Sequence, residues 1–301
     1  MNLPKASTQS SLVIGALFML AMAVFFALGA AMVREASETV DHSITVFFRY
    51  LIGIAFLLPV IHGDSRPTNQ LLFQSQAWRW HIARGLFGFS AMYCYFYTLA
   101  HIPLAEAVLF IYASPVFVPL LAKVLLQETL NTKAIYSALL GLAGLLLLAN
   151  PERTELSHAH FVGLLSTFFG ALAFVSVRRL SITDPPIRTV FFFTAIGTLL
   201  SIAVSLGTDI KQFSGIPQLS LYDLTLLVGI GLVTTLAQWL MSKGYSYGPA
   251  AALAPFSYFT IVFGGLLGWL LWQEAPSLPF ILGTTFVLAA AAVNFRPPTL
   301  K

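Results

Sequence analysis

The sequence predicts an all-α membrane protein whose ten transmembrane helices form two inverted five-helix repeats. The first observation behind this prediction is composition: 57% of the 301 residues are hydrophobic and only 9% are charged, whereas a soluble globular protein is about 25% charged. The second is a series of ten apolar runs, each near the roughly 20 residues that a membrane-spanning helix needs. The third is an internal duplication, which predicts how the helices are arranged.

The ten apolar runs are separated by short segments rich in Pro, Gly, Asn and Asp, the residues typical of turns. They cover residues 12–33, 44–61, 80–99, 104–126, 134–150, 161–180, 188–206, 221–242, 250–272 and 279–295. Strands of a membrane barrel alternate apolar and polar residues, and these runs are apolar throughout, so we expect helices. The first run is longer than the roughly 7–15 residues of a signal-peptide core, so we expect it to remain as a span. Residues 70–80 carry several large apolar side chains and are predicted to lie at the inner interface.

The distribution of Lys and Arg predicts the orientation of the chain. Ten spans place both chain ends on one side, and that side carries 11 Lys and Arg residues against 3 on the other. Cytoplasmic loops carry the excess of these residues, so both termini are expected in the cytoplasm. We therefore predict a multi-pass protein of the plasma membrane, the inner membrane of a bacterium.

Two segments of the sequence occur twice in similar form. TVFFRYLIG (45–53) returns as TVFFFTAIG (189–197), and residues 103–128 align without gaps to residues 249–274 with 11 of 26 positions identical. The chain is therefore predicted to be two related halves, 1–150 and 151–301. Each half holds five spans, an odd number, so the second half enters the membrane in the opposite direction. Inverted repeats of this kind are typical of secondary transporters.

The chain resembles the ten-helix, EamA-type members of the drug/metabolite transporter superfamily. The resemblance rests on the duplicated unit that runs from a Pro to Gln-Glu, on FFRYLIG, and on YTLAHIPLAEAVLFIYASPVFVPLLAKVLLQE, and it extends over nearly the whole chain. It implies that the first, third, fourth, sixth, eighth and ninth helices line a central cavity and that the fifth and tenth are peripheral. The segment PLAEA resembles the corresponding segment in the branch of the family that includes S-adenosylmethionine permeases. The second half departs from the pattern at Ala252, where the first half has Glu106.

Arg49 and Glu106 are the predicted gating or coupling residues. Arg49 lies about 8 Å from the outer end of its span, at 1.5 Å per residue, and its counterpart in the second half is Phe193. An intramembrane arginine usually faces a partner or a wet cavity; the alternatives are a snorkelling side chain or a structural tie. Glu106 is the expected partner of Arg49 and a candidate for proton coupling or cation recognition. Its alternative is a first-turn glutamate favoured by the helix dipole.

Aromatic and hydroxyl side chains recur at matching depths in the two halves. Tyr112 and Ser114 align with Tyr258 and Thr260, and Tyr93 aligns with Trp239. The predicted substrate-binding residues are Tyr93, Tyr97, Tyr112, Ser114, Gln238, Trp239, Tyr258 and Thr260. The alternative for these residues is packing and hydrogen bonding between helices.

The sequence lacks the motifs of nucleotide-driven or covalent catalysis. It contains no P-loop and no GxSxG, and its six histidines lack the companions of a usual metal site. Its longest basic run is the pair Arg178–Arg179, too short to track a nucleic-acid backbone. We therefore expect no enzyme activity, no cofactor, no metal and no nucleic acid. The expected partners are a small-molecule solute and the lipid bilayer, with the chain a monomer or homodimer.

The function predicted from these observations is secondary transport. The solute is expected to be a small amphipathic organic metabolite, such as an amino acid or an aminated metabolite like S-adenosylmethionine, moved by alternating access. Two alternatives remain open: an integral membrane enzyme acting on lipid-linked substrates, and a passive solute channel.

Overall fold

The computed structural model describes residues 9–64, 67–101, 110–129, 132–149, 157–208, 219–273 and 278–295, which fold into helices without a strand in those ranges. In chain order the elements are α1 (Gln9–Ala36), α2 (His42–His62), α3 (Thr68–Phe73), α4 (Trp78–His101), the 3₁₀ turn η1 (Ser114–Val116), α6 (Val118–Leu126), α7 (Thr132–Ala149), α8 (His158–Thr183), α9 (Pro186–Thr208), α10 (Leu221–Tyr245), α11 (Ala250–Leu253), the 3₁₀ turn η4 (Ala254–Tyr258), α12 (Phe259–Trp272) and α13 (Leu278–Phe295). The all-helical class predicted from the sequence is confirmed.

Six helical segments of the described chain are long and apolar enough to cross a membrane. They are Ser10–Ala36, Ser43–His62, His158–Thr183, Pro186–Val204, Leu221–Tyr245 and Ala250–Trp272. Two further apolar helices are shorter, and α4 spans 24 residues with Arg and His in its first two turns. The start of the predicted fourth span, residues 104–109, lies outside the described residues. The count of ten spans therefore stays a prediction, while a multi-pass membrane protein is established.

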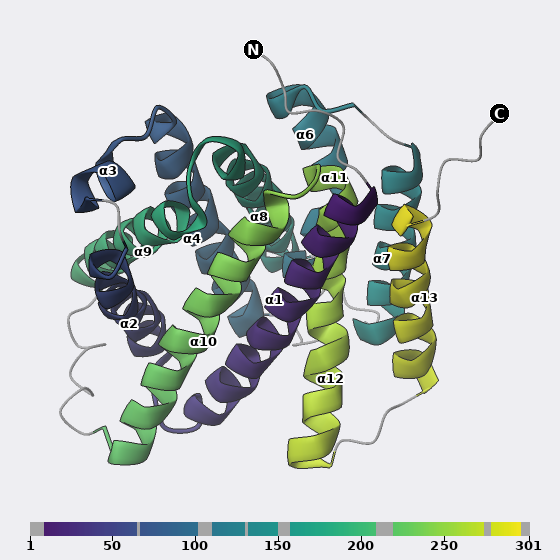
Figure 1. The fold of residues 1–301 in the computed structure, drawn as a ribbon. Helices are drawn as coiled ribbons and strands as arrows, with labels where there is room; N and C mark the ends of the chain where they lie inside the picture. Colours follow the sequence, from purple (N-terminus) through teal and green to yellow (C-terminus); the bar gives the residue numbers. More distant parts are fainter. Residues whose placement is uncertain are drawn as a thin grey trace.

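The two halves of the chain pack against each other in a pattern that repeats with the sequence. Helix α1 packs on α10 and α4 packs on α8, so the first and third spans of each half meet the third and first spans of the other. Helix α2 packs on α9, and α7 packs on α13, so the second and fifth spans each meet their own counterpart. Figure 1 shows α7 and α13 side by side at one edge of the molecule, and the start of α1 and the end of α13 at the same end of the bundle.

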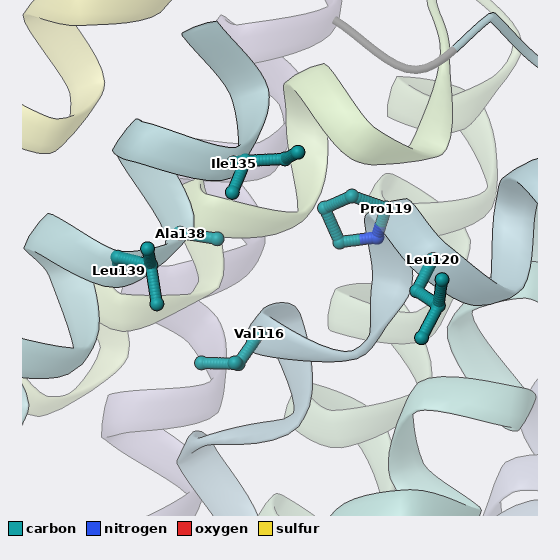
Figure 2. Close-up of a pocket in the computed structure, with 6 residues that line it drawn as sticks. All are labelled: Val116, Pro119, Leu120, Ile135, Ala138 and Leu139. Atoms are coloured by element: carbon teal, nitrogen blue, oxygen red, sulfur yellow. The ribbon is translucent and has the colours of Figure 1, made fainter. Parts of the chain in front are cut away.

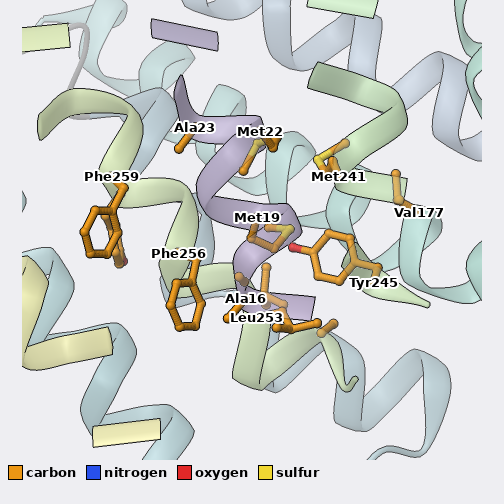
Figure 3. Packing of buried hydrophobic residues seen from close by; sticks show 14 of the residues in the cluster. Ala16, Met19, Met22, Ala23, Val177, Met241, Tyr245, Leu253, Phe256 and Phe259 are labelled. Carbon is orange, nitrogen blue, oxygen red and sulfur yellow. The ribbon is translucent and has the colours of Figure 1, made fainter. Parts of the chain in front are cut away.

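The main hydrophobic core lies between the halves. Met19 and Met22 of α1 are completely buried against Met241 and Tyr245 of α10, and Phe256 of η4 closes the same cluster. Figure 3 shows these side chains converging from helices that are far apart in the sequence. Unbranched methionine side chains fill irregular space between crossing helices, so this core joins the first half to the second.

The duplicated unit ends in the same way in both halves. Each copy ends at a glutamine in the left-handed conformation, with φ of 56° at both Gln127 and Gln273. A left-handed residue is a common way to end a helix, so the repeated Gln-Glu pair marks a helix end. In each copy a 3₁₀ turn containing a proline, Pro115 or Pro255, precedes the final helical segment, but the two turns do not lie at equivalent positions of the repeat.

Glu128, the residue after the first left-handed cap, ties three elements together. Its carboxylate accepts a hydrogen bond of 2.8 Å from Nε of Arg178 on α8 and one of 3.1 Å from the N–H of Ala250 at the start of α11. Arg178 also donates from Nη1 to the carbonyl of Tyr245, at 2.6 Å. The ion pair and these bonds join the end of α6 to both neighbours from the second half.

Candidate functional site: two arginines inside the helix bundle

Arg49 lies within the bundle, on the face of α2 that meets α4. Its position, seven residues after the start of α2, is about 10 Å along the helix. Its Nη1 donates to the sulfur of Met92 on α4, at 3.0 Å, and the hydroxyl of the buried neighbour Tyr50 lies 3.6 Å from the same sulfur. A thioether sulfur is a weak acceptor, so the positive charge of Arg49 is not neutralised by this contact.

Arg84, the seventh residue of α4, is a second arginine in the interior and is only 4% exposed. Its Nη2 donates to Oε1 of Gln238 on α10, at 2.7 Å. Its guanidinium carbon lies 3.8 Å from the ring centroid of Phe193 on α9, a cation–π contact. From the sequence, Arg84 is one of the 11 Lys and Arg residues expected on the cytoplasmic side, so its position in the interior was not predicted.

Gly88 makes room for the guanidinium of Arg84. Arg84, Gly88 and Met92 are spaced four residues apart, so they share one face of α4. A methyl group at residue 88 would overlap Nη1 of Arg84 and would lie 2.8 Å from Cε2 of Phe193. The Arg84 guanidinium therefore lies over Gly88, about one helical turn below the Met92 sulfur that contacts Arg49. The two positive charges are near enough to interact with each other.

Neither of these arginines forms an ion pair with any residue in the described part of the chain. An arginine in the middle of a membrane costs roughly 2.5–3.5 kcal/mol on insertion scales, and such residues usually pair or face a cavity. Two guanidinium groups, contacted by a thioether, an amide and an aromatic ring, thus lie between α2, α4, α9 and α10. These helices supply two spans from each half.

Three predicted substrate-binding residues lie at or near this pair. Gln238 is the hydrogen-bond acceptor of Arg84, and Tyr112, whose hydroxyl is neutral, lies within electrostatic range of Arg49. Trp239, the next residue of α10, packs edge-on against Phe18 of α1 with ring centroids 6.4 Å apart. The structure thus places Gln238 and Tyr112 near the arginines. Trp239 follows Gln238 in the sequence, but its ring packs against α1.

Three other predicted residues are buried in contacts between helices. Ser114 donates 2.8 Å to the carbonyl of Ile111, and its hydroxyl fills the space beside Gly170. Tyr258 donates 3.1 Å to the carbonyl of Ala138 on α7. Thr260 is also buried, but its hydroxyl has no hydrogen-bond partner within the described residues. Ser114 and Tyr258 thus make packing and hydrogen-bond contacts in this conformation, and their role in substrate binding stays a prediction.

Tyr93 and Tyr97 differ from the other predicted residues because their side chains are exposed, at 50% and 43%. Tyr93 stacks on Phe89, with ring centroids 6.2 Å apart, and Tyr97 stacks on His101 at 4.2 Å. The structure therefore does not bring these two tyrosines into the interior. Glu106, the expected partner of Arg49, lies outside the described residues.

A second polar cluster lies at one end of the bundle and holds α3 in place. Arg188 donates to the carbonyls of Gln70, Leu71 and Gln74, and pairs with Asp184 in the turn between α8 and α9. His81 contributes its Nε2 at 3.8 Å from the Asp184 carboxylate. Burial raises the pKa of Asp184, but His81, Arg188 and two hydroxyl donors lower it by more, so the net pKa lies well below the ordinary range. The carboxylate is therefore ionised, and the cluster is a structural clamp.

A pocket of about 140 Å³ lies elsewhere, between η1, α6 and α7. Figure 2 shows that its lining is entirely apolar and includes Val116, Pro119 and Leu139. It contains no group that recognises a polar solute. The described residues also contain no cluster of three His, Cys, Asp or Glu side chains that would hold a metal ion.

Comparison with known proteins identifies the family. The model of the EamA-like transporter family matches twice, over residues 13–150 and again over residues 158–296. The chain belongs to the EamA-like transporter family. The resemblance stated from the sequence is confirmed, together with the two-repeat fold.

Several relatives of this EamA-like transporter carry named functions. The pseudopaline exporter CntI of Pseudomonas aeruginosa is 31% identical over 272 residues, which are 90% of this chain and 92% of the exporter. A riboflavin transporter of Brucella anthropi is 24% identical, over 84% of this chain and 87% of its own length. An S-adenosylmethionine uptake transporter of Rickettsia bellii is 23% identical, over 83% and 81%. Family and relatives together indicate a transporter of small metabolites.

One solved crystal structure has the same fold as this EamA-like transporter. The two structures superpose with a TM-score of 0.76 at 21% sequence identity, over 94% of this chain and 97% of the other. At this level of identity the likeness establishes the fold alone.

Proposed function

We propose that this protein is a secondary transporter that moves a small amphipathic organic metabolite by alternating access between two inverted halves. The solute is an amino acid or an aminated metabolite of the kind that S-adenosylmethionine represents. Its path runs between the halves, past Tyr112, Gln238 and the hydroxyl of Thr260, which has no hydrogen-bond partner in the described part of the chain. Both chain ends lie in the cytoplasm.

The observation that carries this proposal is the contact between Arg84 and Gln238. It places a buried charge of the first half on an amide of the second half, at the level where α2, α4, α9 and α10 meet. In inverted-repeat transporters the solute site lies near the membrane midplane between the repeats. Burying a charge without an ion-pair partner is costly. An arginine at this position is therefore better explained by a binding role than by stabilisation of a packed core.

Arg49 and Glu106 keep their proposed role as gating or coupling groups. Arg49 lies about 10 Å from the start of α2, and its counterpart in the second half is the uncharged Phe193. The weak sulfur contact of Arg49 leaves its guanidinium ready to change partners when the halves move.

Proteoliposomes test the proposal. Vesicles containing the purified protein are loaded with a deproteinised metabolite extract, and mass spectrometry identifies solutes released faster than from protein-free vesicles. Release of specific small metabolites, accelerated by the same solute on the opposite side, is expected for alternating access. Release without such counterflow indicates a channel, and the absence of any release contradicts transport. S-adenosylmethionine and riboflavin serve as individual probes.

A further inference from the structure

We propose that Arg49 and Arg84 together bind one oxyanion of the transported solute, so that the substrates are organic anions or zwitterions carrying a carboxylate or phosphate group. This inference rests on the proposed transport function and adds the chemical class of the solute. It assigns a binding role to Arg84, which the sequence patterns did not single out.

The first support is the number of unused donors. A guanidinium presents five N–H groups in a planar fork. Within the described residues, Arg84 has one hydrogen bond, to Gln238, and Arg49 has one, to the sulfur of Met92. Planar guanidinium groups match carboxylate and phosphate oxygens with two parallel hydrogen bonds. No other described residue occupies the remaining donors of the two side chains, so these donors can receive an oxyanion.

The second support is the position of the two groups along α4. The guanidinium of Arg84 lies over Gly88, and Arg49 contacts Met92, four residues further along the same face of α4. These two residues of α4 are separated by a rise of about 6 Å along the helix axis. Neighbouring cations repel each other unless an anion lies between them, so this arrangement favours one carboxylate or phosphate in contact with both.

The third support is the relation of the two arginines to the repeat. Met92 and Gln238 occupy equivalent positions in the two halves, and each accepts a hydrogen bond from one arginine. Phe193, the counterpart of Arg49, lies under the guanidinium of Arg84. The second copy of the repeated segment, TVFFFTAIG, has no arginine, and Arg84 supplies a positive charge next to it. The two guanidinium groups therefore occupy corresponding places, one beside Met92 and one beside Gln238.

Charge-selective labelling tests this site without knowledge of the natural solute. Met92→Cys, in a Cys94→Ala background that removes the single native cysteine, places a thiol beside Arg49. Its reaction rates are measured with a sulfonate-bearing and a trimethylammonium-bearing methanethiosulfonate, each divided by the rate with free cysteine. We expect the sulfonate to react at least tenfold faster, and this preference to fall toward one when Arg49→Gln or Arg84→Gln is added. Equal rates, a preference for the cation, or no reaction with either reagent would overturn the site.

Protection against labelling distinguishes the two oxyanions. Phenylacetate and phenyl phosphate are compared with neutral phenylacetamide at equal concentration. Stronger protection by phenylacetate assigns a carboxylate, and stronger protection by phenyl phosphate assigns a phosphate. Protection by phenylacetamide that equals both contradicts recognition of charge.

Gln238→Glu separates solute binding from a structural role. The new carboxylate would pair with Arg84 and occupy the place of the solute anion. If Arg84 only stabilises the fold, this substitution raises the melting temperature and leaves the preference of the Met92→Cys thiol for the sulfonate reagent unchanged. If Arg84 binds the oxyanion, the protein stays folded and that preference falls toward one, as with Arg84→Gln. Failure of wild-type release contradicts the transport proposal, whereas wild-type release of solutes that all lack an oxyanion contradicts only this inference.

Discussion

Arg84 of α4 donates a hydrogen bond of 2.7 Å to Oε1 of Gln238 on α10. The bond joins the third span of one half to the third span of the other, and the Phe193 ring from α9 packs against the guanidinium. One side of Arg84 is thus held in place, which fixes the direction in which its other donors point. A fixed donor set loses little conformational entropy when a solute binds.

Gly88→Ala is expected to abolish transport while leaving the protein folded. The added methyl overlaps Nη1 of Arg84 and lies 2.8 Å from Cε2 of the buried Phe193 ring, so both groups must shift. Ala is a better helix former than Gly by about 1 kcal/mol, which offsets part of the cost of moving the ring. We expect solute release from vesicles to fall at least tenfold, with a melting temperature that is lower than that of the wild type but still shows a folded protein.

The matched control is Gly264→Ala, because a methyl group at this helical glycine meets nothing within 4 Å. Its transport rate is expected to equal that of the wild type. Equal activity of both variants would show that the position of the Arg84 guanidinium does not matter for transport.

The Glu128–Arg178 pair is expected to stabilise the junction between the halves as a unit. Glu128→Gln and Arg178→Gln each leave a partly buried charge without its partner, which typically costs on the order of 3 kcal/mol. Because both substitutions break one network, the double variant should lose less stability than the sum of the single ones, by about 1 kcal/mol or more. Additive losses in thermal unfolding of the detergent-solubilised protein would show that the 2.8 Å contact contributes nothing.

Asp184→Asn is expected to destabilise the protein in a pH-dependent manner. The folded-state pKa of Asp184 lies below its ordinary value of 3.8, so the ionised carboxylate stabilises the fold above about pH 4. That contribution is lost as pH falls below 3.8 toward the folded-state pKa. The melting temperature of Asp184→Asn should therefore lie below that of the wild type at pH 7, and the difference should shrink below pH 4. A difference that stays constant from pH 7 to pH 3 would be incompatible with an ionised clamp.

Fusions to the chain ends test the orientation of the two halves. Both ends are proposed to lie in the cytoplasm, because an even number of spans separates them and 10 Lys and Arg residues, the earlier count without the interior Arg84, are assigned to that side. Green fluorescent protein should fluoresce at either end, and alkaline phosphatase should be inactive at either end. Active phosphatase at one terminus would show an odd number of spans.

The fold was predictable because its signals are properties of long segments. Runs of about 20 apolar residues indicate helices whatever their neighbours are, and the repeated phrase around Tyr112 and Tyr258 indicates two related halves. The helix ends were also encoded, since Gln127 and Gln273 recur as left-handed caps. These features depend on local sequence, which a single chain displays directly.

The site was only partly predictable because its members come from helices far apart in the sequence. Gln238 was singled out because a buried amide needs partners, and its partner proved to be Arg84. Arg84 itself lies near the start of α4, where the sequence pattern equally fits a flanking charge; only its packing over Gly88 shows that it turns inward. Tyr93 was selected for its aromatic ring, but the pattern of α4 does not distinguish its outer face from the inner one.

Labelling of Met92→Cys from the two sides of the membrane tests the central claim most directly. In the Cys94→Ala background, a membrane-impermeant sulfonate reagent is applied to right-side-out vesicles and, separately, to inside-out vesicles. Alternating access around the arginine pair predicts that the thiol is modified from both sides and that transported solute slows both reactions. Modification from one side only, or from neither, would contradict a transport path that passes Arg49 and Arg84.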